Sequence, residues 1–120
     1  MAYRVQKVEQ LIKDEVSLIL LEKMRDSLNG MVTVTTVKLS PDLKQAKIYV
    51  SVLEADRRKP VMEKLADSLG MIRSTLASRI RLRFVPELKF FLDDTADYVD
   101  HLEQLFKQIR ENDNKDEQTG

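Results

Sequence analysis

Four arginines lie close together in the second half of the chain and give the sequence its clearest chemical signal. The stretch that holds them has no acidic residue, and they are Arg73, Arg79, Arg81 and Arg83. At about 100° per helical residue, Arg73 and Arg79 flank an apolar stripe while Arg81 points away from it. Outward cations bind phosphate with release of counterions, and Ser74 and Ser78 add hydroxyl groups beside them. These six residues are therefore the candidate RNA-binding residues.

A solvated basic helix face explains the same cluster equally well when the cluster is taken alone. The charge distribution along the chain adds an independent signal. Net charge is zero, yet residues 1–92 carry 17 Lys and Arg against 11 Asp and Glu (+6), and residues 93–120 carry 3 against 9 (−6). A basic body with an acidic end favours nucleic-acid binding.

Other reactive groups have simpler interpretations. His101 lies between Asp100 and Leu102 with no nucleophile near it in sequence, so it is expected on the wet side of a helix. Asp93 and Asp94 could hold Mg²⁺, but capping of the last helix by Asp94 or Thr95 explains them better. There is no Cys, and no nucleotide-binding or nucleophile–base pattern is present. The sequence predicts no enzyme activity, no metal and no cofactor.

The first half of the chain predicts one helix followed by a β-hairpin. Apolar residues recur every three or four positions from Arg4 to about Lys23, and Asn29-Gly30 is expected to stop the helix. The β-branched run 32–37 favours a strand, and residues 46–52 alternate between apolar and polar side chains. A turn at 40–43 joins these strands into an antiparallel pair.

The second half predicts two helices, a strand and a final helix. The helices are expected to bend at Ser68-Leu69-Gly70, with Gly70 kept because a kink or a close approach needs it. A strand follows Pro86 over residues 88–92. The final helix has an apolar stripe that should be buried, formed by Val99, Leu102, Leu105, Phe106 and Ile109.

This order, α-β-β-α-α-β-α, predicts an α+β domain with helices on one face of a three-stranded sheet. Its first six elements are those of the type II K-homology fold, in which nucleic acid approaches a Gly-containing turn between helices. The domain is expected to span residues 1–111, with a disordered polar tail at 112–120. No apolar run is long enough for a signal peptide or a membrane span, which predicts a cytoplasmic protein.

Several blocks of the sequence resemble the ribosome-binding factor A family. The N-terminal half matches it at Tyr3-Arg4-Val5, at 34–43 and at 46–51. The most specific block runs from Gly70-Met71-Ile72-Arg73-Ser74 through residues 81–90 to Asp93. These blocks appear in the family's order and cover nearly the whole chain.

The resemblance implies a type II K-homology domain in which an Ala-X-Gly kink replaces the GXXG loop. Here Ser68 stands where Ala is usual, and Ser is small enough to keep the bend. It also implies a monomeric, non-catalytic assembly factor that binds the immature small (30S) ribosomal subunit and its 16S rRNA. Such factors assist rRNA maturation and late subunit assembly and are associated with cold adaptation.

A second class of function stays open. An exposed strand face or the last helix could dock another protein, with the arginines serving only solubility. RNA binding through phosphates weakens steeply with salt, whereas a protein-only association would be salt-insensitive. Sensitivity to salt therefore separates the two classes.

Overall fold

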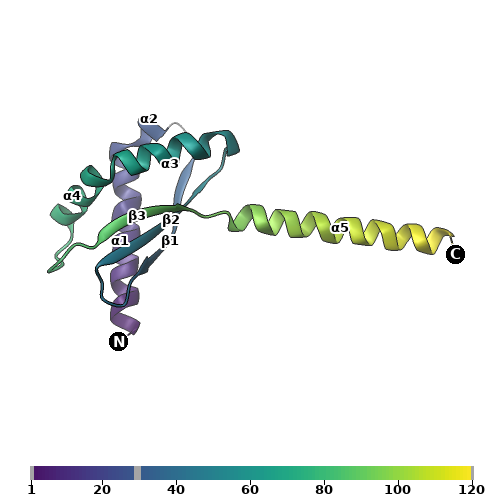
Figure 1. The fold of residues 1–120 in the computed structure, drawn as a ribbon, viewed down its shortest axis with the longest axis horizontal. Helices are drawn as coiled ribbons and strands as arrows, with labels where there is room; N and C mark the ends of the chain where they lie inside the picture. Colours follow the sequence, from purple (N-terminus) through teal and green to yellow (C-terminus); the bar gives the residue numbers. More distant parts are fainter. Residues whose placement is uncertain (1, 29–30, 120) are drawn as a thin grey trace.

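The fold is a three-stranded sheet covered on one face by helices, with one further helix that projects away (Figure 1). This computed structural model describes the backbone of residues 2–28 and 31–119, and the side chains of residues 4–28, 31–95 and 100–111. The molecule is elongated, at 69 × 38 × 17 Å. The element order confirms the predicted α+β K-homology-like arrangement, with the added C-terminal helix.

The sheet has the strand order β1-β2-β3. Strands β1 (Val32–Leu39) and β2 (Gln45–Val52) form the predicted antiparallel hairpin, in which Val37 pairs with Ile48. The register shifts between Val34 and Thr36, which leaves Thr35 as a bulged residue. Strand β3 (Glu87–Leu92) pairs with β2 in parallel, and it can do so because the two helices between them provide the crossover.

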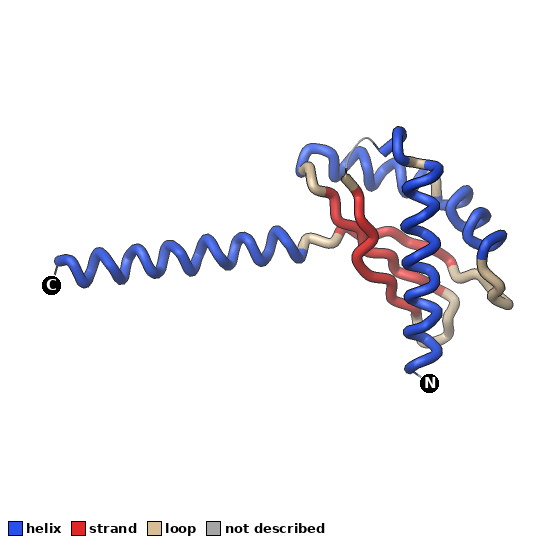
Figure 2. The backbone as a smooth tube through the Cα atoms, turned by 180° about the vertical axis from the view of Figure 1, so that it is seen from behind, coloured by secondary structure: helices blue, strands red, loops and turns tan. Residues whose placement is uncertain are grey.

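The hydrophobic core lies between this sheet and three helices. In β2 the buried positions alternate along the strand, as the sequence predicts, and they are Ala46, Ile48, Val50 and Val52. Helix α1 (Ala2–Lys23) contributes its predicted stripe, including the fully buried Ile12, Val16 and Ile19. Helix α1 runs behind the sheet in Figure 1 and in front of it in Figure 2. The buried residues of the sheet thus point to its helix-covered face, and the alternating residues between them point to the opposite face.

Two short helical segments were not predicted. Helix α1 ends at Lys23, and α2 (Arg25–Leu28) follows, bringing Leu28 into the core. A single 3-10 turn, η1 (Ala55–Arg57), precedes the third helix. The predicted stop at Asn29-Gly30 lies outside the described residues.

Helices α3 (Arg58–Asp67) and α4 (Leu69–Arg79) meet at Ser68, which ends one helix and starts the next. The kink is therefore at the predicted Ser68-Leu69-Gly70 segment, but Gly70 itself lies in the first turn of α4. Apart from its chain neighbours and the backbone of its own helix, no described atom comes within 4 Å of the place where its Cβ would be, and its φ is not positive. The expectation that this glycine permits a close approach within the fold is wrong.

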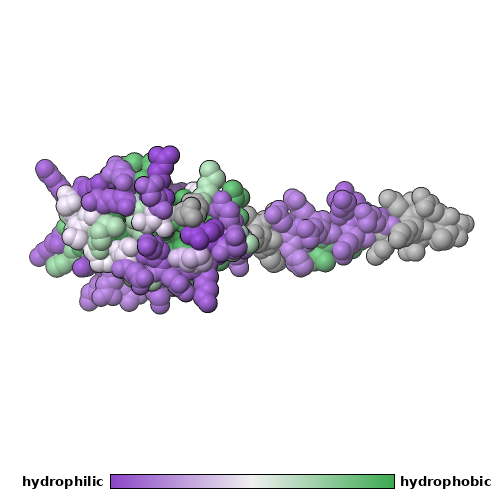
Figure 3. Space-filling model, turned by 90° about the horizontal axis from the view of Figure 1, so that it is seen from above, coloured by the Kyte–Doolittle hydropathy of each residue, from purple (hydrophilic) through white to green (hydrophobic). Residues whose placement is uncertain are grey.

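Helix α5 (Thr95–Thr119) extends away from the body (Figures 1 and 2). Its predicted stripe is not buried: Leu105, Phe106 and Ile109 are 41%, 58% and 55% exposed. None of its described side chains belongs to the core, since the helix projects away from the sheet and the other helices (Figure 1). Figure 3 shows mostly hydrophilic side chains along its described part, with a hydrophobic patch on one side.

The backbone of residues 112–119 is helical, where the sequence predicts a disordered tail. Division of the chain at residue 111 stays a prediction. Within the described ranges, no helix combines the length and the apolar character needed to cross a bilayer.

Candidate nucleic-acid interface

The arginines of the predicted cluster have different surroundings in the structure: some bond within the protein, and others face solvent. The kink and the last arginines lie at opposite ends of α4, about 15 Å apart at 1.5 Å per residue. Arg73 reaches from α4 to the segment before β3, where its Nη2 donates to the Val85 carbonyl at 2.8 Å and its Nε to the Pro86 carbonyl at 3.3 Å. This side chain therefore fastens β3 to α4.

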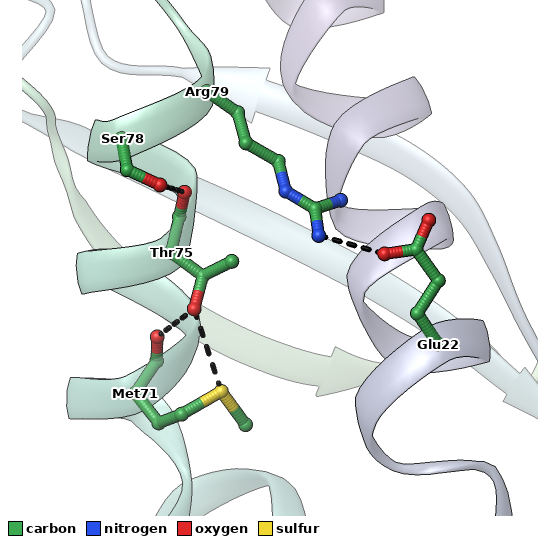
Figure 4. Close-up of polar contacts among 5 residues, drawn as sticks. All are labelled: Glu22, Met71, Thr75, Ser78 and Arg79. Atoms are coloured by element: carbon green, nitrogen blue, oxygen red, sulfur yellow. Dashed lines mark hydrogen bonds and ion pairs between the residues drawn. The ribbon is translucent and has the colours of Figure 1, made fainter.

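Arg79 is also engaged within the protein. Its Nη2 lies 2.7 Å from the Glu22 Oε2 of α1, and the pair joins the two helices (Figure 4). The hydroxyl of Ser78 donates to the Thr75 carbonyl at 2.7 Å, and the Thr75 hydroxyl donates to the Met71 carbonyl. These bonds turn the two hydroxyls back onto their own helix, as serine and threonine do in helix interiors.

The remaining predicted residues face solvent. Ser74 and Arg81 are exposed. The Arg83 guanidinium lies over the Phe84 ring, 5.6 Å from its centroid, and Phe84 is 76% exposed. A large exposed aromatic ring beside a cation is a pairing suited to unstacked bases. Among the arginines, Arg81 and Arg83 are thus placed to meet a ligand.

An open groove of about 900 Å³ gathers basic side chains from four separate segments. Its walls are the start of α1, the hairpin turn at 41–45 and the segment 82–87, and Arg73 reaches into it from α4. The basic residues in it are Arg4, Lys44, Arg73 and Arg83, and the acidic ones are Asp42 and Glu87. The groove therefore has a net positive lining, which favours an anionic ligand.

Arg4, Lys44 and Phe84 were not among the predicted site residues. Arg4 and Lys44 lie far from the arginine stretch in sequence, and Phe84 directly follows Arg83 but carries no charge. For Lys44, the sequence does predict the turn beside it, because Ser40, Pro41 and Asp42 are typical turn residues. There Asp42 accepts hydrogen bonds from the Ser40 hydroxyl at 2.6 Å and the Lys44 amide at 3.1 Å. These bonds hold the pKa of the Asp42 carboxyl below its usual value.

The kink leaves the first turn of α4 uncovered. The Ser68 side chain makes no capping hydrogen bond to it, and exposed Gly70 has no Cβ above its amides. The first amides of a helix have no intrahelical acceptor and attract anions. The kink is thus a second place at which phosphate can approach the backbone.

The two aspartates before α5 serve structure. Asp93 accepts from the Thr35 hydroxyl at 2.6 Å, from the Thr95 hydroxyl at 2.5 Å and from the Thr95 amide at 3.0 Å. The Thr35 bond, followed by the two Thr95 bonds, lowers the pKa of the Asp93 carboxyl. Of the pair expected at the start of the last helix, it is therefore the Asp93 carboxylate that bonds the first residue of α5. No group of three potential metal ligands occurs among the described residues, and His101 is exposed on α5 as predicted.

A sheet with helices on one face, and two helices that meet at a kink before the last strand, define a K-homology-like domain. The class is one of small α+β domains. The chain belongs to the ribosome-binding factor A family, whose model matches residues 4–106.

Relatives agree with this assignment over most of their length. The chain is 38% identical to ribosome-binding factor A of Thermodesulfovibrio yellowstonii over 107 residues, which are 89% of this chain and 91% of the relative. It is 40% identical to that of Natranaerobius thermophilus over 107 residues, which are 88% and 82% of the two chains.

Solved structures share the fold. The crystal structure of ribosome-binding factor A from Thermus thermophilus matches with a TM-score of 0.65 and 23% identity over 73% of this chain and 94% of that one. A Thermotoga maritima protein solved by NMR matches at 0.61 and 33% identity, over 76% and 88%. A third match, at 0.60 and 23% identity over 70% and 89%, is a Thermus thermophilus model fitted into a cryo-EM map of a 30S complex.

Proposed function

We propose that this protein is a non-catalytic assembly factor that binds the immature small ribosomal subunit through its 16S rRNA. Membership in the ribosome-binding factor A family supports the proposal, as does the Thermus thermophilus relative fitted into a 30S complex. The observation that carries it is the convergence of Arg4, Lys44 and Arg83 on one groove from three distant segments. Chain folding brings these cations together although local sequence does not.

The proposed contact has two parts with different chemistry. The groove supplies cations for phosphates and the Phe84 ring for an unstacked base, and Arg81 adds a cation at the end of α4. The kink supplies the first turn of α4, to which the Ser68 side chain makes no capping bond. Arg73 and Arg79 act mainly by holding α4 against β3 and α1.

The same proposal covers the biological setting. We expect a cytoplasmic monomer that assists rRNA maturation and late assembly of the small subunit, with a growth defect in the cold when it is missing. A protein that binds one particle and then leaves needs contacts that are numerous and individually weak. Exposed phosphate contacts have that character because salt screens them.

Cosedimentation with small subunits over a series of salt concentrations tests the RNA contact. The variant Arg81→Ala/Arg83→Ala should fold normally, bind about tenfold more weakly at low salt and reduce the salt slope by about one per lost phosphate contact. Lys64→Ala, at an exposed position of α3, is the matched control and should leave both quantities unchanged. Unchanged affinity and slope in the folded double variant would rule out this interface.

A further inference from the structure

The face of the sheet that points away from the helices carries an ordered set of side chains that the groove does not use. Lys38, Lys47 and Lys89 stand in one row, because Lys38 pairs with Lys47 on β2 and Lys47 pairs with Lys89 on β3. All three are exposed. Three like charges side by side repel each other, so they favour an anion that neutralises them.

The next outward row along the strands is aromatic. Tyr49 and Phe91 pair across β2 and β3, and their rings stack with centroids 5.5 Å apart and planes at 28°. Both rings are half-buried, and neither belongs to the hydrophobic core on the other face. Two adjacent rings on an open sheet form a flat apolar platform of the size of a nucleobase.

The two rows are in contact. The Lys89 and Lys47 ammonium groups lie 5.5 and 6.0 Å from the centre of the Phe91 ring, and Lys38 lies 6.0 Å from that of Tyr49. In a single nucleic-acid strand, the distance between a base and the phosphate next to it is comparable to these distances between ammonium groups and rings. A ligand with alternating π-faces and anionic groups therefore matches both rows at once.

Two carboxylates flank this surface without covering it. Glu87 pairs with Gln45 at one end, beyond the lysine row, and Asp93 at the other end is held by Thr35 and Thr95. Gln45 and Glu87 also line the groove. The groove therefore borders the end of the sheet next to the lysine row, so a strand that leaves the groove at this end would reach the sheet face.

We propose that this open sheet face is a second binding surface for single-stranded RNA, in which bases stack on Tyr49 and Phe91 and phosphates contact Lys38, Lys47 and Lys89. The platform tolerates many sequences, because every base has a π-face and no donor or acceptor set reads the base edges. It would hold a single-stranded segment next to the part of the RNA bound in the groove. The inference takes RNA as the ligand from the proposed function but uses different residues.

Fluorescence anisotropy with the full-length protein and labelled ten-nucleotide A and U strands tests this surface without the ribosome. The A strand should bind more tightly than the U strand, since adenine stacks better. Phe91→Leu and Tyr49→Leu should each weaken binding of the A strand about five- to hundredfold. Phe91→Tyr keeps the ring and should retain binding, which separates loss of stacking from loss of fold.

Lysine variants test the phosphate contacts. Lys47→Gln should lower the salt slope by about 0.7, whereas Lys64→Gln on the helix side should leave it unchanged. Wild-type affinity in folded Tyr49→Leu and Phe91→Leu would overturn the proposal. A second outcome would also overturn it: the wild-type protein does not bind the A strand, yet the Tyr49→Leu and Phe91→Leu variants lose binding to the small subunit. The sheet face would then bind a protein of the subunit and not RNA.

The groove variant Arg81→Ala/Arg83→Ala distinguishes the two proposals. If it loses the small subunit but keeps the A strand on the sheet face, both proposals are supported. If it keeps the subunit while Phe91→Leu loses the A strand, the groove proposal fails and the sheet-face proposal stands.

Discussion

Arg73 and Arg81 belong to one acid-free stretch of sequence, yet they have different roles at the scale of single residues. Arg73 donates two hydrogen bonds to the carbonyls before β3, whereas Arg81 is exposed with no hydrogen bond or ion pair described for it. Arg73→Ala should therefore lower the free energy of unfolding by about 1–2 kcal/mol, and Arg81→Ala should change it by less than about 0.5 kcal/mol. Urea unfolding of both variants measures the difference. Equal stabilities would show that the Arg73 bonds contribute nothing.

Asp93 links β1 to the start of α5 and makes stability depend on pH. Its hydrogen bonds favour the ionised carboxylate and lower its pKa in the folded protein. The stabilisation is therefore present above the pKa of the unfolded chain and is lost as pH falls through the lower folded value. Asp93→Asn should melt at a lower temperature than wild type at pH 7, and the gap should shrink as the pH falls below 3.8, the ordinary pKa of the carboxyl. A gap independent of pH would contradict this role.

At the scale of elements, the kink between α3 and α4 can be tested at Gly70. The position has helical backbone and open space around the missing Cβ. Gly70→Ala should therefore stabilise the fold by about 0.4–1 kcal/mol by restricting the unfolded chain. If phosphate approaches the first amides of α4, the added methyl group should also weaken binding to small subunits. Thermal unfolding and cosedimentation measure the two effects, and a stabilised variant with full affinity would remove the kink from the interface.

At the scale of the whole molecule, α5 gives the protein its shape. The Cα radius of gyration is 19.3 Å, against about 14 Å for a compact chain of this length. Small-angle scattering should therefore give a radius near 19 Å. A value near 14 Å would mean that α5 folds back onto the body and covers its exposed apolar stripe.

Removal of most of α5 should not unfold the body. A chain that ends at Ala96 keeps Thr95 and its bonds to Asp93. Because no described side chain of α5 belongs to the core, its free energy of unfolding should stay within about 0.5 kcal/mol of wild type. The sequence alone predicts the opposite result: it predicts that the apolar stripe of this helix is buried, so that removal of the helix would destabilise the fold. Chemical denaturation of the truncated chain decides between them.

Periodicity determined the elements and the core from the sequence alone. Helix α1 and strand β2 bury the residues that recur at helical and strand spacing, because a side chain's direction follows directly from its place in a regular element. Turn chemistry likewise located the hairpin, and the junction of α3 and α4 at Ser68 falls within the segment where a bend is predicted. These features depend on neighbours close in sequence, so the sequence by itself was sufficient.

Tertiary structure alone decided which cations are available and what covers each face. Arg79 is paired with Glu22, 57 positions away, and no local pattern encodes that partner. The groove and the aromatic–lysine surface each assemble residues from different strands or loops. For α5, the sequence specified an amphipathic helix but not a surface to receive it, since burial requires a second element in the right place.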